Sequence, residues 1–264
     1  MNWMSIFYRN KNLYCAVLVF MTGICQDLSA QTSFPERCSG STELKSIYLK
    51  DWESGLSPWI AGTYEVGNPS TFDTPDWAIS NELPGERSGN AAFIANLDIG
   101  DCASDDESGV LTLESPTISI PSDIQVPRIS VDHWFQVEEL WDGGNFKISV
   151  NGGVFELIPN TAIIHAPYND TLNAAVDEFG LLFNLNPLAG ETAFTGTMRG
   201  GTEGTWEQTQ IILTGIAQPG DSIKLRLDFG IDDCGGDVGW FVDDLEVFSC
   251  EAASSEECGD GILN

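Results

Sequence analysis

The sequence predicts an all-β domain, an antiparallel β-sandwich of two sheets. From about residue 46 to residue 250, short segments of period-two character are separated by clusters of Gly, Pro, Asn and Asp, which is typical of sandwiches and barrels. We find no convincing pattern for a helix of ordinary length in this region. Sandwiches of about 200 residues commonly form a single domain, so one core is expected.

The expected strands are defined by alternating apolar and polar residues. They cover residues 47–53, 91–95, 110–113, 128–136, 145–150, 205–213, 222–229 and 239–248. The alternation is clearest in 128–136, where Ile129, Val131 and Phe135 fall on one face, as in a half-buried strand. Asn151-Gly152-Gly153 follows 145–150 and predicts a hairpin, because these residues tolerate positive φ.

Residues 1–30 have the pattern of a secretory signal peptide. Arg9 and Lys11 precede an apolar run at 14–24, and Ala30 closes a plausible cleavage site. The run is shorter than the roughly 20 residues that span a bilayer, although an uncleaved anchor is the alternative. We therefore expect a secreted or cell-surface protein, with no membrane insertion after signal cleavage. Residues 31–45 form a polar lead-in.

The chain is strongly acidic, with 40 Asp and Glu against 11 Lys and Arg and a formal net charge of −29. This balance argues against nucleic acid and against an anionic membrane as partners. It is compatible with divalent cations, or with a solvated acidic surface.

Five of the seven cysteines lie after the predicted signal, and disulfides are the default in an exported chain. Spacing alone leaves their pairing open. Cys38 and Cys250 bracket the strand-rich region, and Cys102 and Cys234 each lie in an acidic, glycine-containing loop. We expect these two pairs to form, with Cys258 left over.

One long insert, residues 159–204, has few strand signals. Long segments without secondary structure are uncommon and often functional. We expect instead a lid packed on the sandwich through Phe179, Leu182, Phe183 and Phe194, since these side chains would otherwise be exposed.

Four motifs occur in order along the chain: residues 51–59 (Asp-Trp-Glu-Ser-Gly-Leu-Ser-Pro-Trp), 108–116 (Ser-Gly-Val-Leu-Thr-Leu-Glu-Ser-Pro), Gly204-Thr205-Trp206, and 239–250. Together they resemble a MAM domain, or the similar jelly-roll modules of bacterial secreted and surface proteins, over residues 46–250. The resemblance implies jelly-roll topology. Ser57 and Pro58 stand where MAM domains usually carry a cysteine, and the 159–204 insert is longer than typical.

The tail at 258–264 (Cys-Gly-Asp-Gly-Ile-Leu-Asn) resembles the opening of a myxobacterial-type cysteine-rich repeat. Residues 251–264 are then a linker and the truncated start of that repeat. The resemblance implies that Cys258 pairs further along a longer protein.

Familiar catalytic motifs are missing from the sequence. It has two histidines, His133 and His165, and neither an H-E-x-x-H nor a G-x-S-x-G motif. His133 lies in an alternating strand and is expected to be a hydrogen-bonded structural residue. We therefore expect a non-catalytic chain.

A structural calcium ion is the cofactor that the resemblance implies. In similar jelly-roll modules the ion is held by a first-strand glutamate and a last-strand aspartate. By position these are Glu53 and either Asp243 or Asp244, with Asp51 on the same side of the first strand as Glu53. Calcium takes six to eight oxygen ligands, although solvated acids are the alternative.

A second acidic group surrounds the other cysteine pair. Its residues are Asp98, Asp101, Asp105, Asp106 and Glu107 near Cys102, and Asp232, Asp233 and Asp237 near Cys234. They form either a second cation site or a charged rim.

The segment that follows residue 136 carries a possible ligand platform, with Trp134 and Trp141 beside Glu138 and Asp142. The same residues also fit a plain strand end and turn, because Asp142-Gly143 is a turn pair. A glycosidase would need two such carboxylates on either side of a cleft.

The function expected from the sequence is a binding or adhesion module of a secreted or cell-surface protein, with a protein or carbohydrate ligand. The alternatives are an accessory domain of an exported hydrolase of metalloprotease type, and a carbohydrate-binding or glycosidase jelly roll. Trp52, Trp59, Trp206 and Trp240 are expected to be buried.

Overall fold

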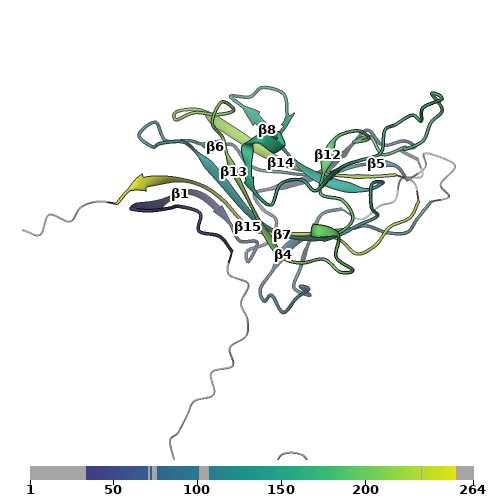
Figure 1. Cartoon of the computed structure of the whole chain (residues 1–264), viewed down its shortest axis with the longest axis horizontal. Helices are drawn as coiled ribbons and strands as arrows, with labels where there is room; N and C mark the ends of the chain where they lie inside the picture. The colour runs from purple at the N-terminus through teal and green to yellow at the C-terminus, as the bar shows by residue number, and fades with distance from the viewer. Residues whose placement is uncertain (1–33, 71, 73–75, 101–106, 233, 254–264) are drawn as a thin grey trace, which may run out of the picture. The chain divides into compact units, whose positions relative to one another are not determined.

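Two antiparallel sheets form the domain, and they confirm the predicted all-β jelly-roll sandwich (Figure 1). The computed structural model describes residues 34–70, 72, 76–100, 107–232 and 234–253. In this part of the chain, one sheet has the order β10-β13-β7-β15-β4-β3, with β1 also paired to β15. The other has the order β2-β5-β14-β8-β9, with β6 paired to β14, and β11 and β12 form a small third sheet.

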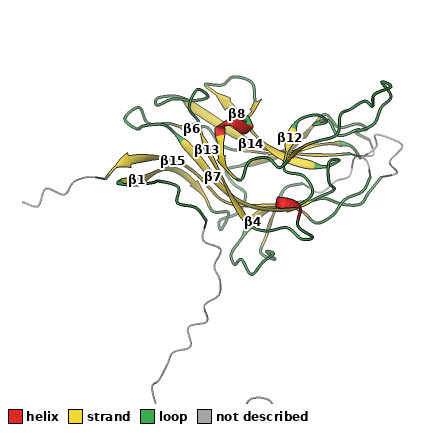
Figure 2. Cartoon of the chain, viewed as in Figure 1, coloured by secondary structure: helices red, strands yellow, loops and turns green. Residues whose placement is uncertain are grey.

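The described chain is almost entirely strand and loop (Figure 2). The strands are β1 (Thr42–Lys50), β2 (Ile60–Tyr64), β3 (Ala78–Ser80), β4 (Ala91–Ala95), β5 (Gly109–Glu114), β6 (Ile118–Ser119), β7 (Arg128–Gln136), β8 (Gly143–Val150), β9 (Glu156–Leu157), β10 (Ile163–His165), β11 (Asp170–Thr171), β12 (Thr192–Ala193), β13 (Glu207–Ile212), β14 (Ser222–Ile231) and β15 (Gly239–Ala252). Two 3-10 turns are present, η1 (Asn160–Ala162) and η2 (Met198–Gly200). Within the described residues, no helix has the length and apolar character needed to cross a membrane.

The main core lies between the two large sheets. Alternation on β7 places Ile129 and Val131 in the same buried cluster as Phe146 of β8 and Leu227 of β14, because successive side chains of a strand point to opposite faces. The predicted burial of the four tryptophans is confirmed: Trp52, Trp59, Trp206 and Trp240 are all buried. The predicted Asn151-Gly152 turn is also present, with positive φ at both residues.

The first and last strands pair as expected. β1 runs antiparallel to β15 from Thr42, opposite Ala252, to Lys50, opposite Leu245. The predicted disulfide between Cys38 and Cys250 is present beside this pairing. Cys234 also takes part in a disulfide, whereas Cys102, its expected partner, and Cys258 lie outside the described residues.

Two details of the first strand differ from the prediction. β1 begins at Thr42, inside the predicted polar lead-in, and it ends at Lys50. The chain turns at Trp52, whose φ is 59° and whose indole is buried. Asp51 and Glu53 therefore lie in a turn and not on one side of a strand, so that part of the prediction was wrong.

The 159–204 insert is packed only in part. Phe194 is buried, and its backbone exchanges hydrogen bonds of 3.0 and 2.8 Å with Gly144 of β8. Phe179, Leu182 and Phe183 were also expected to pack the insert on the sandwich, and that expectation was wrong, because all three are exposed. Tyr168 fills the core instead: it is buried, and its hydroxyl accepts a hydrogen bond from the amide of Phe146.

Candidate functional site

A tight loop between β7 and β8 brings two carboxylates together. The amide of Asp142 donates a hydrogen bond of 3.1 Å to the carbonyl of Glu138. Leu140, between them, has a φ of 68°, in the left-handed region that few side chains adopt. The loop thereby closes on itself and places the side chains of Glu138 and Asp142 side by side.

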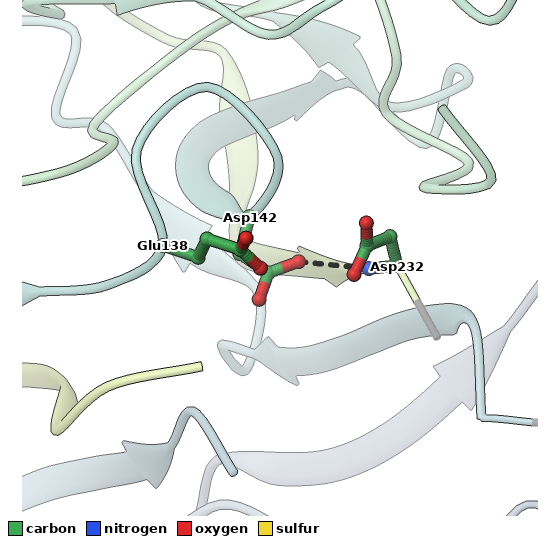
Figure 3. Close-up of side chains that lie close together, drawn as sticks. All are labelled: Glu138, Asp142 and Asp232. Atoms are coloured by element: carbon green, nitrogen blue, oxygen red, sulfur yellow. Dashed lines mark hydrogen bonds between the residues drawn. The ribbon is translucent and has the colours of Figure 1, made fainter. Parts of the chain in front are cut away.

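A third carboxylate comes from Asp232, directly after β14. Its backbone amide donates a hydrogen bond of 2.8 Å to Oδ1 of Asp142, as Figure 3 shows. Glu138, Asp142 and Asp232 each offer an oxygen atom, and these atoms all lie within 4.8 Å of one another. Among the described residues this is the one group of three acidic, histidine or cysteine side chains with that geometry. We call it the carboxylate triad.

Asn96, which follows β4, forms hydrogen bonds with two members of the triad and with Asp237. Its Nδ2 donates to Oδ2 of Asp142 at 2.5 Å. Its Oδ1 accepts hydrogen bonds from the amides of Glu138, at 3.0 Å, and Asp237, at 3.1 Å. Because Asn96 and Asp142 are almost completely buried, this network fixes the loops around the triad.

Two carboxyl groups of the triad have raised pKa values. Burial, together with the charges of Asp232 and Asp98, raises the pKa of Glu138 to about 7. Burial and the charge of Asp232 raise the pKa of Asp142 well above its usual value. Crowded, buried carboxylates need either protons or a cation.

The residues present fit a hard cation. Oε2 of Glu138 is buried and accepts no hydrogen bond from any described residue. The donor set of the triad consists of oxygen atoms, which calcium and magnesium prefer. The space around Glu138 is also tight, since a side chain at Gly235 would collide with its carboxylate.

The first predicted metal set has other partners in the structure. The guanidinium of Arg87 bonds Asp132, Asp243 and Asp244 at 3.0, 2.7 and 2.8 Å, and it lies over the ring of Trp206. A cation is thus already present beside the two last-strand aspartates, and sequence reasoning missed it.

The other two residues of that set lie in the turn after β1. Glu53 accepts hydrogen bonds from the backbone amide and the side chain of Asn90, at 2.9 and 2.7 Å. Asp51 is exposed and accepts a hydrogen bond from the amide of Glu53. Within the described residues, Asp51, Glu53, Asp243 and Asp244 form no group with the geometry of the triad.

The described residues of the second predicted cation site do not form a single group. Asp232 belongs to the triad, and Asp98 is exposed but close enough to act on the pKa of Glu138. Both oxygens of Asp237 accept from Gln136 at 3.0 Å. Asp101, Asp105, Asp106 and Asp233 lie outside the described residues.

Of the two tryptophans in the predicted ligand platform, Trp141 is partly accessible and Trp134 is not. Trp141 is half-buried and contacts Phe183 of the insert, with ring centroids 4.9 Å apart. Trp134 was wrongly included, because it is buried in a separate cluster with Trp206 and Phe241. Glu138 and Asp142, the acids of the platform, belong to the triad.

His133 is structural, as predicted. It is buried, its Nε2 lies 2.8 Å from Oγ1 of Thr209, and its Nδ1 accepts a hydrogen bond of 3.2 Å from the indole of Trp240. An indole nitrogen only donates, so Nδ1 is the acceptor and the proton of the neutral ring is on Nε2.

The fold and the site define a jelly-roll β-sandwich with an oxygen-only candidate metal centre, and the half-buried Trp141 of the same loop contacts the exposed Phe183. No protein-family model and no curated protein matches the chain.

Several solved structures are similar at low identity. One is the carbohydrate-binding module TmCBM61 in complex with β-1,4-galactotriose, with 15% identity over 75% of this chain and 94% of that one, and a TM-score of 0.40. Another is the K3 cleaved adhesin domain of Lys-gingipain from Porphyromonas gingivalis, with 14% identity over 78% and 99% and a TM-score of 0.38. A third is the module CBM27-1 of Caldicellulosiruptor saccharolyticus in complex with mannohexaose, with 9% identity over 77% and 96% and a TM-score of 0.38.

Proposed function

We propose that this chain is a non-catalytic, extracellular binding module, stabilised by calcium at the carboxylate triad. The proposal rests on the carboxylate of Glu138. Its buried Oε2 accepts no hydrogen bond from any described residue, and one of its oxygens lies within 4.8 Å of oxygens of Asp142 and Asp232. Calcium would neutralise this charge and take ligand oxygens from Glu138, Asp142 and Asp232. The disulfide between Cys38 and Cys250 supports an oxidising, extracellular location.

The ligand face that we infer is formed by Trp141 and Phe183. Trp141 lies inside the loop that carries Glu138 and Asp142, so a metal at the triad would hold its ring in place. Half-exposed, rigid aromatic rings offer a large apolar surface at a low cost in conformational entropy. Carbohydrate is the ligand class we favour, and a protein ligand is the alternative. We also propose that the module acts in adhesion, as the resemblance to MAM domains implies.

A glycosidase is the less favoured function. A catalytic acid must reach the glycosidic oxygen of its substrate. Asp142 has only 1% of its surface exposed, and its two oxygens accept hydrogen bonds from Asn96 and from the amide of Asp232. Its burial is better suited to a structural ion than to proton transfer.

Calcium titration calorimetry tests the metal part of this proposal. We expect the wild type to bind calcium at the triad and Glu138→Gln to weaken that binding at least tenfold. Glu139→Gln is the matched control, because Glu139 is the neighbouring carboxylate, is exposed and is not in the triad. Equal affinity in Glu138→Gln and Glu139→Gln would refute a site at the triad.

A glycan array tests the ligand face. We expect Trp141→Ala to lose the glycans that the wild type binds. Phe155→Ala should retain them, since Phe155 is a half-buried aromatic residue that packs on Arg226 and not on the triad loop. Unchanged glycan binding in Trp141→Ala would contradict the proposed face.

A further inference from the structure

Five exposed large apolar side chains lie in one hairpin of the insert, residues 173–184, which we call the apolar hairpin. At its tip the exposed fractions are 79% for Phe179, 65% for Leu181 and 77% for Leu182. Val176 and Phe183, on the two arms, are also exposed. Exposed large apolar side chains concentrated in one short segment are typical of a contact site for a partner or a membrane.

The apolar hairpin is held in shape by its own hydrogen bonds. Oδ1 of Asp177 accepts from the amides of Phe179 and Leu181, both at 2.9 Å. The carbonyl of Asp177 accepts from Gly180 at 3.0 Å, and its amide donates to the carbonyl of Leu181 at 2.8 Å. The amides of Asp177, Phe179, Gly180 and Leu181 therefore all donate hydrogen bonds within the hairpin. Internal satisfaction is the condition for placing a backbone in a low-dielectric medium.

The base of the apolar hairpin is fixed to the sandwich. The amide of Asn173 donates to the carbonyl of Leu140 at 2.9 Å, and Nδ2 of Asn184 donates to the carbonyl of Asn173 at 3.1 Å. The ring contact of Phe183 with Trp141 adds a second anchor. Because the hairpin is preorganised, little conformational entropy is lost when its tip is covered.

The size and charge of the tip decide between its possible occupants. A stable protein interface takes about 800 Å² and about 20–30 residues from each partner, whereas the apolar hairpin exposes five large apolar side chains. A second copy would also bring another net charge of −29. A bilayer surface needs no complementary shape, and apolar side chains can enter its headgroup boundary. Glu178, exposed at the tip, opposes anionic lipid.

We propose that the apolar hairpin is a peripheral membrane contact that inserts Phe179, Leu181 and Leu182 into a zwitterionic, phosphocholine-type lipid surface. The contact reaches the boundary between headgroups and acyl chains and does not span the bilayer. It departs from the expectation, drawn from the sequence, that the mature protein does not insert into a membrane. None of the three inserting side chains belongs to the carboxylate triad or to the proposed ligand face, so vesicle binding can fail while the proposed function stands.

Flotation with vesicles of pure palmitoyl-oleoyl-phosphatidylcholine tests this inference. We expect the wild type to float with the vesicles and the triple variant Phe179→Ser, Leu181→Ser, Leu182→Ser to lose at least tenfold in partition coefficient. Val154→Ser is the matched control, because Val154 is also 77% exposed but lies in the turn after β8. Its partitioning should stay within twofold of the wild type.

Melting curves of the same variants should show that each is folded, since the altered side chains are exposed. The inference is overturned if the wild type does not float with the vesicles, or if the triple variant and Val154→Ser bind equally. It is also overturned if the wild type sediments as a dimer that the triple variant dissociates, because a second copy would then be the occupant.

Discussion

The backbone amide of Asp232 donates a hydrogen bond to Oδ1 of Asp142, at 2.8 Å and across 90 residues of sequence. This bond ties the end of β14 to the loop between β7 and β8. It also holds a buried carboxylate next to two others in spite of their mutual repulsion. An arrangement that gathers like charges in this way is stabilised when a cation is added.

The first prediction concerns thermal stability in calcium. A ligand that binds only the folded state stabilises it by RT ln(1 + [L]/Kd), about 2.7 kcal/mol at a hundredfold excess over Kd. For a domain of this size we expect the melting temperature to rise by roughly 5–11 °C. Chelation should reverse the rise. Magnesium should replace calcium poorly, since it demands a smaller octahedral shell.

Screening of the acidic surface is the competing explanation for such a rise. It predicts that sodium chloride reproduces the whole effect. A melting temperature that responds to salt but not to a chelator would therefore leave the triad as ordinary acids.

The second prediction is that the wild type and Glu138→Gln exchange the order of their melting temperatures between chelator and calcium. The pKa of Glu138 is raised to about 7 in the folded state, above that of an unfolded glutamate, so its ionisation at pH 8 destabilises the fold. In a chelator at pH 8 the neutral Gln variant should melt above the wild type. In saturating calcium the Gln variant should melt at a lower temperature than the wild type. The same order in both buffers would mean that Glu138 does not bind the ion.

The third prediction concerns Arg87. Its guanidinium is the partner of Asp132, Asp243 and Asp244, and burial raises the pKa of Asp243 to about 6 despite that partner. Removing one member of a buried ion pair costs about 3–5 kcal/mol. Denaturant unfolding of Arg87→Met should show a loss of this order. Arg87→Lys should retain only part of the stability, because one ammonium cannot bond three carboxylates in the same fork geometry. A loss below about 1 kcal/mol, the median of a surface pair, would contradict the structural role.

The fourth prediction is a pH dependence that comes from His133. Burial lowers the pKa of His133 to about 3, while an unfolded histidine titrates near 6.5. The unfolded state therefore takes up the proton first, so the stability is fully present above pH 6.5 and is lost as the pH falls toward 3.

Comparison with His133→Gln isolates this effect, because all other titrations are shared. The difference in unfolding free energy between the wild type and the variant should shrink below pH 6.5, by about 1.4 kcal/mol per pH unit. A difference that does not vary between pH 7 and pH 4 would show that His133 is free to protonate in the fold.

Much of the fold could be predicted from the sequence, because it is encoded locally. The alternation in 128–136 predicted β7 at its observed bounds, and the terminal cysteines predicted the pairing of β1 with β15. Short strands such as β3 and β9 carry too few residues to show a period. The end of β1 depends on the burial of Trp52, which is a tertiary effect.

The site was predicted less well. Asp142 and Asp232 were each singled out, but in separate groups, because nothing in their spacing shows that strands 90 residues apart bring them together. Asn96 and Arg87 carry no motif, and only the packed structure assigns them their partners. The spacing of Glu138 and Asp142, four residues apart in a loop with a Gly at its end, was the one available signal.

A crystal structure of the mature protein grown in calcium tests the central claim most directly. The account predicts one strong electron-density peak bonded to oxygens of Glu138, Asp142 and Asp232, at about 2.3–2.6 Å. The peak should be absent from crystals of Glu138→Gln grown in the same solution. A calcium ion at Glu53 and Asp243 instead, or a triad that contains only water in saturating calcium, would contradict the account.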